Sequence, residues 1–175
     1  MNSLPLKEVA RRLDEAKITW CVFAGAAASV YGSHRLLTDV DILIPSTEGD
    51  QLAALFPEAR VERQRDGSVR GIKLPNIDII AGLDVIDLDK AMAERLDWYE
   101  VAGVIAPVIP PEDNILLKAI WGRGTEVGKH DWEDVEAMLG NVFTLIDWDY
   151  LYWRAKKCGT EHVLGQLEAI GQTNT

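Results

Sequence analysis

The alternation of apolar and polar side chains predicts a chain in which short helices and strands follow one another. Residues 4–16 carry apolar side chains at the spacing of one helix face, and polar side chains cover the other face. Residues 18–23 form a nearly continuous apolar run, which is typical of a strand buried on both faces. Gly25 ends this run, and the small side chains after it favour a short, tightly packed helix. Residues 38–44 are the second predicted strand.

The segment from residue 59 to residue 82 has apolar positions at a period of two, which indicates strands. Asp66-Gly67 inside it is a typical hairpin turn. Pro75-Asn76 breaks the return strand, and residues 77–81 then form another strand. We therefore predict a hairpin that is followed at once by a third neighbouring strand.

The later segments mix both kinds of element. We expect a short helix at residues 88–96 and a strand at residues 99–105. Residues 104–111 are too rich in proline for a central strand, so we expect an extended connector there. Pro111 then begins a helix, because proline suits the first helical position and acids follow it in the first turn. A further helix is predicted at residues 129–139.

This order of elements indicates one fold class. Strands that alternate with helices, followed by helices alone, predict an α/β (α+β) protein with a small mixed sheet flanked by helices. We expect an α/β core at residues 1–108. Residues 109–175 should form a helical carboxy-terminal part that packs on this core and ends in two short helices.

Two carboxylates stand out on the second predicted strand. Asp39 and Asp41 are two residues apart, so they face the same side, while Val40 and Ile42 face the other. Two like charges side by side are unfavourable unless a cation lies between them. Mg²⁺ is the natural candidate, since one or two carboxylates and phosphate oxygens bind it. The alternative is a solvated strand end with two incidental acids.

The sequence around these acids resembles a known signature. Phe23-Ala24-Gly25-Ala26, a spacer and Asp39-Val40-Asp41-Ile42 resemble the hG[G/S] and Dh[D/E]h motifs of the polymerase-β-type nucleotidyltransferase superfamily. Residues 32–41 read G-S-H-R-L-L-T-D-V-D, similar to the G-x-x-R-x-T-x-D-h-D of the small stand-alone (minimal, AbiEii-like) members. Two positions depart from the pattern: Ala26 stands where active members usually carry Gly or Ser, and Thr38 is one residue nearer the first Asp.

The resemblance implies a metal site built from three carboxylates. Asp39 and Asp41 would hold Mg²⁺ or Mn²⁺ against a nucleoside triphosphate. Asp78 lies alone in a later apolar strand, and the resemblance implies that it is the third carboxylate, catalytic like the first two. Read by itself, Asp78 is equally a strand position that faces solvent. Asp84 and Asp87 compete for the third position, but they fall in a loop.

Further residues are candidates for binding the nucleotide. Gly25 and Ala26 lie at the turn where the backbone would approach the phosphates. Arg35 could bind two phosphate oxygens at once through its planar guanidinium. Lys118 and Lys129 are weaker candidates, because solvated helix lysines would give the same pattern.

A second block of sequence extends the resemblance to residues 18–140. The run P-E-D-N-I-L-L-K followed by K-H-D-W-E-D is similar to the carboxy-terminal half of the same small nucleotidyltransferases. Asp131 and Asp134 lie three apart on one helix face of this block. Acids near a helix start are usually caps or dipole partners, so their role stays open.

Composition restricts the partners. The net charge of −10 argues against an extended nucleic-acid surface, because phosphate backbones need basic stripes. No apolar run is long enough to span a membrane and no signal peptide opens the chain, so we expect a cytoplasmic protein. Cys21 and Cys158 are isolated, which favours structural thiols.

The sequence therefore predicts a metal-dependent nucleotidyltransferase that moves a nucleoside monophosphate from a triphosphate to an acceptor hydroxyl. The acceptor, whether a small molecule, a protein or an RNA end, is not identified by the residues. Ala26 keeps open a degenerate nucleotide-binding or regulatory protein of the same fold, of toxin–antitoxin type. Such a protein could act with a partner protein or as a homo-oligomer. A second alternative is an unrelated acidic interaction domain.

Overall fold

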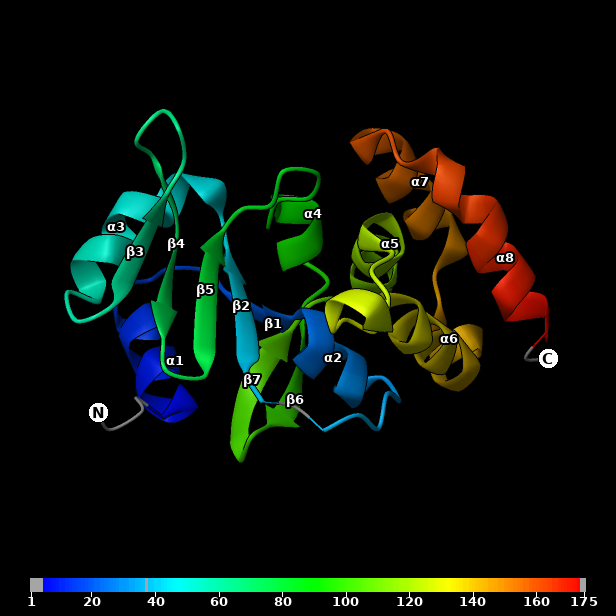
Figure 1. Cartoon of the computed structure of the whole chain (residues 1–175), viewed down its shortest axis with the longest axis horizontal. Coiled ribbons are helices and arrows are strands. Elements are labelled where there is room, and N and C mark those ends of the chain that lie inside the picture. Colours follow the sequence, from blue (N-terminus) through cyan, green and yellow to red (C-terminus); the bar gives the residue numbers. More distant parts are fainter. Residues whose placement is uncertain (1–4, 37, 174–175) are drawn as a thin grey trace.

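A mixed sheet of seven strands forms the centre of the computed structural model, which describes residues 5–36 and 38–173. The strand order across the sheet is β3-β4-β5-β2-β1-β7-β6 (Figure 1). The strands are β1 (Cys21–Phe23), β2 (Val40–Ile44), β3 (Arg60–Arg63), β4 (Val69–Leu74), β5 (Ile77–Ala81), β6 (Asp97–Val101) and β7 (Val104–Val108). The predicted fold class is confirmed. Leu4 of the first predicted helix and Leu37 of the predicted loop lie outside the described residues.

Helices surround this sheet and fill one end of the molecule. Those that alternate with the strands are α1 (Leu6–Glu15), α2 (Ala24–Val30), α3 (Gly49–Leu55) and α4 (Lys90–Ala93). Those that follow the last strand are α5 (Pro111–Trp121), α6 (Asp131–Val142), α7 (Trp148–Cys158) and α8 (Leu164–Thr173). The second group lies together on the right of Figure 1. No helix among the described residues is both long and apolar enough to cross a membrane.

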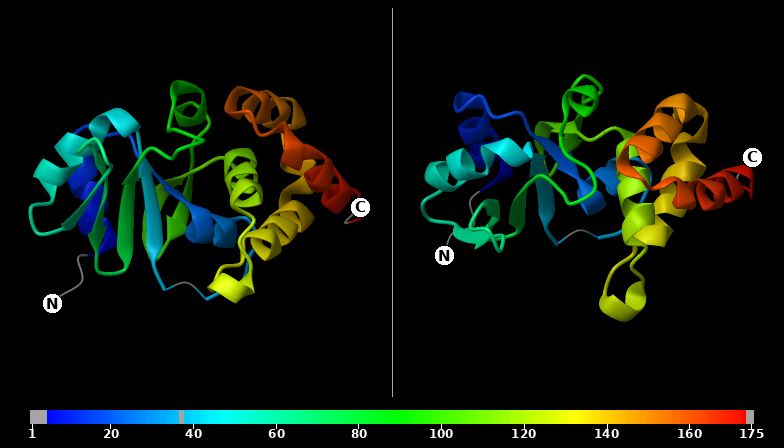
Figure 2. Two further views of the ribbon diagram at one scale, coloured as in Figure 1. Left: turned by 45° about the horizontal axis from the view of Figure 1, so that its top comes forward. Right: turned by 90° about the horizontal axis from the view of Figure 1, so that it is seen from above.

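The sheet has one apolar face and one that carries the acids. On β5, Ile77, Ile79 and Ala81 are buried, whereas Asp78 and Ile80 are only half-buried. Gly49 of α3 packs closely against Ala81, and α1 lies on the same side of the sheet as α3 (Figure 2). The hydrophobic effect therefore fixes the register, because a shift by one residue would turn the acids into the core.

Two predictions about the last strands are wrong. Residues 99–105 are not one strand: Ala102 and Gly103, both with positive φ, form the turn of a hairpin between β6 and β7. Residues 104–108 are not a connector either, because β7 pairs with both β1 and β6. Pro107 is tolerated since β1 pairs with β7 only at Val22 and Val108, where the missing N–H of Pro107 is not needed.

Helix α5 is the buried centre of the carboxy-terminal part. It packs against α2, α6 and α7, and its residues from Glu112 to Ala119 are all buried. Four of these buried residues are polar or charged: Glu112, Asp113, Asn114 and Lys118. Buried polar groups are costly unless they are paired, so each of them requires a partner on a neighbouring element.

One of these pairings ties α7 to the segment before α4. Arg154 is 1% exposed, and its Nε lies 2.8 Å from Oδ1 of the fully buried Asp113. Its Nη1 and Nη2 donate to the carboxylate of Asp89, which also caps α4 by accepting from the Met92 N–H. Asp89 precedes residue 108 and Arg154 follows it, so this ion pair bridges the two predicted parts. The division into an α/β core and a helical part remains a prediction.

We predict that Arg154→Met lowers the free energy of unfolding by about 3–5 kcal/mol, because it leaves Asp113 buried without a counter-ion. Urea unfolding measures the loss. Lys157→Met is the matched control: Lys157 also contacts Asp89, but its side chain is 49% exposed, so about 1 kcal/mol or less is expected. Equal losses for both variants would contradict the structural role of Arg154.

Candidate functional site

One cavity of about 200 Å³ joins the sheet to the helical part. Its acidic wall lies at the start of β2 and on β5, and consists of Asp39, Asp41 and Asp78. Its basic wall comes from the loop before β2, from α5 and from the segment after α5, and consists of Arg35, Lys118, Arg123 and Lys129. Gly25 also lines the cavity, so every site residue predicted from the sequence except Ala26 contributes to it.

The acidic wall follows from the pairing of two parallel strands. Asp41 on β2 and Asp78 on β5 are register partners, which places them side by side on one face of the sheet. Asp39 precedes β2 by one residue and is exposed. Asp84 and Asp87, the alternatives for the third carboxylate, do not line the cavity; Asp87 accepts hydrogen bonds from Ser46 instead.

The nearby lysines do not fully offset the negative charges around Asp41 in the acidic wall. Burial, and then the charges of Asp39 and Asp78, raise the pKa of Asp41 to about 6, although Lys129 and Lys118 act in the opposite direction. Burial contributes most to this shift and the two neighbouring carboxylates add to it, so the ionised form of Asp41 is costly here. A cation bound here would lower that cost.

The present orientation of the side chains limits how many carboxylates can share one metal ion. Asp78 forms an ion pair with Lys73, whose Nζ lies 2.5 Å from its Oδ2. Within residues 5–36 and 38–173, no three His, Cys, Asp or Glu side chains are arranged to hold a metal ion. Asp39 and Asp41 alone nevertheless suit Mg²⁺, since that ion needs only one or two carboxylates when phosphate oxygens complete its shell.

The turn between β1 and α2 brings the backbone to the cavity in a strained conformation. Ala24 has a φ of +55°, in the left-handed region, which costs a residue with a side chain about 1–2 kcal/mol. Asn114 of α5 holds this turn from both sides. Its Oδ1 accepts from the Ala24 N–H at 2.8 Å, and its Nδ2 donates to the Ala24 carbonyl at 3.1 Å.

Ala26, which the sequence marks as the departure from the active pattern, does not face the cavity. Its side chain is 2% exposed and belongs to the hydrophobic core, because the first turn of α2 directs it inward. Ala24 and Gly25 line the cavity instead. The position at which a glycine would relieve strain is therefore Ala24, and the signal for it, a left-handed φ, is not visible in the sequence.

The basic wall is organised by the two acids whose role the sequence leaves open. Lys118 is 3% exposed, and its Nζ lies 3.1 Å from Oδ1 of Asp131 and 2.7 Å from Oδ2 of Asp134. Arg123 donates from Nε to Asp131 at 2.7 Å. Arg35 donates from Nη2 to Asp134 at 3.1 Å. Asp131 and Asp134 thus hold three cations in place around the cavity.

The balance of charge in this network stays positive. Burial raises the pKa of both acids, but hydrogen bonds from Arg123 and Lys118 to Asp131, and from Arg35, Lys118 and Ser33 to Asp134, outweigh it and lower their pKa. Both carboxylates are therefore ionised at neutral pH and leave one of the three cations uncompensated. Lys129 adds a further positive charge, since its side chain makes no ion pair or hydrogen bond among the described residues, although its backbone N–H donates to the Gly124 carbonyl.

Sequence reasoning missed Arg123, Asn114 and Ala24 as parts of this site. Arg123 lies between two glycines directly after α5, and its guanidinium stacks over the Trp121 ring at 4.4 Å. An arginine in a glycine-rich loop next to a candidate lysine helix is a signal that could have been used. Asn114 offers no such signal, because a single polar residue in an apolar helix does not indicate its partner.

The comparisons with known proteins concern the fold. No family model and no curated protein matches the chain. Among solved structures, the antibiotic-resistance factor ANT(2'')-Ia is 17% identical with a TM-score of 0.57, covering 92% of this chain and 95% of that one. Its complex with adenylyl-2''-tobramycin gives 15% identity and a TM-score of 0.58, covering 87% and 94%. TM1012 from Thermotoga maritima, assigned to the nucleotidyltransferases, gives 17% and 0.53, covering 70% and 85%.

The chain has a nucleotidyltransferase-like fold. The match with ANT(2'')-Ia covers 92% of this chain, so it includes both the sheet and helices that follow it. At these identities the likeness establishes the fold and not the reaction.

We predict that Asn114→Ala lowers the free energy of unfolding by about 2–4 kcal/mol, because the N–H and the carbonyl of Ala24 both lose a buried partner. Thermal or urea unfolding measures the change. Asn141→Ala is the matched control, since the more exposed Asn141 makes one hydrogen bond, to the Tyr31 carbonyl, and should cost about 1 kcal/mol. A loss at Asn114 no larger than at Asn141 would show that the two hydrogen bonds of Asn114 do not hold the turn at Ala24.

We also predict that Asp41→Asn stabilises the metal-free protein above neutral pH. The folded pKa of Asp41 is raised, so its ionisation costs stability as pH rises from the ordinary value of 3.8 through about 6. Removing the charge should therefore add about 1–3 kcal/mol at pH 7.5, and this gain should shrink toward pH 4. Urea unfolding with a chelator present measures both. A variant less stable than wild type at pH 7.5 would show that Asp41 is structural.

Proposed function

We propose that this protein transfers a nucleoside monophosphate from a nucleoside triphosphate to an acceptor hydroxyl. One observation carries the proposal: within a nucleotidyltransferase-like fold, a single cavity sets Asp39, Asp41 and Asp78 against a wall of four cations, whose own acid is Asp131. A triphosphate with a divalent cation needs both walls, because the cation binds carboxylates while the phosphates bind arginine and lysine. A surface with incidental acids would not require the second wall.

The acidic wall would perform the chemistry. Asp39 and Asp41 would hold Mg²⁺ or Mn²⁺, which when bound neutralises charge on the triphosphate. The acceptor oxygen forms a bond to the α-phosphorus, and the bond from that phosphorus to pyrophosphate breaks, so pyrophosphate leaves with the electron pair. Asp78 would accept the proton of the acceptor hydroxyl, and its ion pair with Lys73 orients the carboxylate.

The basic wall would bind the phosphates, with different duties for its members. The Lys129 side chain has no ion-pair or hydrogen-bond partner among the described residues, and the Arg123 side chain is 39% exposed, so both can turn toward a ligand. Lys118 is enclosed by Asp131 and Asp134 and would act mainly by fixing the positions of its neighbours. Arg35 shares Asp134 with it and keeps part of its fork for phosphate. Gly25 lets the backbone approach without a side chain in the way.

A second candidate is a nucleotide-binding or regulatory protein of the same fold without turnover. The ion pair between Lys73 and Asp78 favours it, because the Lys73 ammonium group occupies an oxygen of Asp78 that a transferase would need for the acceptor hydroxyl. The AbiEii-like subtype, the toxin–antitoxin role, a partner protein or homo-oligomer and a cytoplasmic location are further proposals that rest on the sequence resemblance.

Metal and nucleotide binding test the proposal. We predict that wild-type protein binds Mn²⁺ with ATP, GTP, CTP or UTP at millimolar concentration or below, and transfers label from the α-phosphate to an acceptor in a cell extract. Asp39→Asn and Asp41→Asn should weaken Mn²⁺ binding about tenfold or more, since each removes a charged ligand. Asp50→Asn, at an exposed position on α3, is the matched control and should change nothing.

The outcomes separate the two candidates. Absence of nucleotide binding to the wild type with metal present would overturn both of them. Nucleotide binding that depends on Asp39 and Asp41, with no label transferred to any acceptor, would support the binding protein and reject the transferase.

A further inference from the structure

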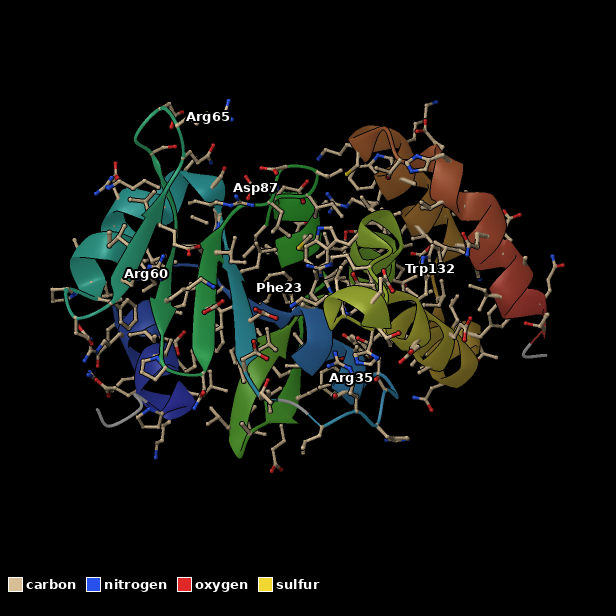
Figure 3. All side chains as sticks on the ribbon, viewed as in Figure 1. Phe23, Arg35, Arg60, Arg65, Asp87 and Trp132 are labelled. Atoms are coloured by element: carbon tan, nitrogen blue, oxygen red, sulfur yellow. The ribbon has the colours of Figure 1, made fainter. Side chains whose placement is uncertain are left out.

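The hairpin of β3 and β4 places basic side chains next to the acidic wall, on the same face of the sheet. Register pairs run across the sheet from Asp41 to Asp78, from Asp78 to Lys73 and from Lys73 to Arg60. Residues paired in this way face the same side of a sheet. Figure 3 shows Arg60 and Arg35 on opposite sides of β2 and β5. The face that carries the candidate site therefore continues outward, away from the basic wall, as a row that changes from negative to positive.

Hollows in the surface follow this row. Asp78 lines both the candidate cavity and a second hollow of about 310 Å³ over β3, β4 and β5. Glu62 and Arg70 line this second hollow and also a third one beside it. Arg60 lines the third hollow. The first and second hollows share Asp78, and the second and third share Glu62 and Arg70, so the hollows adjoin one another from Asp78 to Arg60. We call the second and third hollows the hairpin groove.

A bulge directs one arginine into this groove. Glu62 pairs with Gly71 and Arg63 pairs with Val69, so Arg70 is an extra residue on β4 without a register partner. Bulges commonly redirect a side chain, and this one gives the groove an arginine from the second strand of the hairpin. Protection of the sheet edge does not explain Arg70, because a charge with that role would be expected on the edge strand β3 and not on β4.

The charge of the groove is opposite to that of the whole chain. Among the described residues, the side chains of Arg60 and Arg70 make no ion pair or hydrogen bond, while Lys73 is already paired with Asp78. Glu62 is the opposing acid in the groove. Two unpaired guanidinium groups thus line the hairpin groove, which begins at Asp78, in a protein of net charge −10. Such groups bind phosphate or carboxylate oxygens in pairs.

We propose that the hairpin groove is the acceptor site, and that the acceptor is a small alcohol carrying a phosphate or carboxylate group. Arg60 and Arg70 bind this anionic group while the hydroxyl lies at Asp78. The reaction is the one given above: the hydroxyl oxygen bonds to the α-phosphorus, pyrophosphate leaves, and the proton passes to Asp78. This inference rests on the proposed function, and it adds the charge of the acceptor and the residues that select it.

Binding can be measured without turnover. Glycerol 3-phosphate, glycerate and glycerol are matched probes that differ in the anionic group. We expect saturable NMR shifts of the Arg60 and Arg70 Nε–H signals with one or both anionic probes, and none with glycerol. The anionic probe that binds identifies the group that the groove accepts. Arg60→Gln with Arg70→Gln should weaken this binding about tenfold or more, because two charge-assisted hydrogen-bond donors are lost.

A control variant and a kinetic measurement sharpen the test. Arg65 lies at the hairpin turn outside the groove, so Arg65→Gln should leave probe binding unchanged. Where label is transferred, the double variant should raise KM for the anionic probe about tenfold with little change in kcat, and it should keep its affinity for Mn²⁺ and nucleotide.

Three results would overturn this inference while the proposed function stands: no shift at Arg60 and Arg70, equal binding of glycerol, or equal weakening by Arg65→Gln. The last would mean that the arginines attract anions without selecting them. Absence of nucleotide binding to the wild-type protein would instead overturn the proposed function, and a separate titration with nucleotide and metal measures this binding.

Discussion

The cost of keeping the carboxylates of Asp39, Asp41 and Asp78 together in one wall is the constraint around which the site is built. Burial contributes most to the cost of ionising Asp41, and the parallel pairing of β2 and β5 adds repulsion because it forces Asp41 and Asp78 side by side. The protein does not remove this charge; it places Lys73 on one side of it and the basic wall on the other. Sites that keep a destabilising cluster of this kind are commonly functional, because a bound ligand offsets the cost.

Helix α5 holds the parts of the molecule in register with that cluster. Asn114 fixes the strained turn at Ala24, Lys118 gathers Asp131 and Asp134, and Asp113 pairs with Arg154. These three buried polar side chains on one helix thus reach three different parts of the chain. A small shift of α5 would disturb the turn, the basic wall and the contact with α7 together, because paired buried groups tolerate little displacement.

The sequence was sufficient for the fold class and for placing Asp39 and Asp41 on one face, because strand periodicity determines which side chains share a face. Asp78 came from the family resemblance, because periodicity does not show that β5 lies beside β2. It was not sufficient where backbone geometry or distant partners decide. The turn at Ala102-Gly103 needs positive φ at an alanine, and Pro107 is acceptable only because β1 pairs with β7 at Val22 and Val108 alone. Asp131 and Asp134 read as helix-start acids, since their partner Lys118 lies on another helix. Ala26 looked like a change within the site, although its side chain is buried in the core. The sequence does not show this, because the burial depends on how α2 is rotated.

The most direct test of the account is a crystal structure of the protein with Mn²⁺ and a non-hydrolysable nucleoside triphosphate. The account predicts an anomalous Mn²⁺ peak at Asp39 and Asp41, with the phosphates between that ion and the Lys129 and Arg123 side of the cavity. Nucleotide bound elsewhere on the protein, or phosphates in the cavity with the metal ion away from both carboxylates, would contradict it.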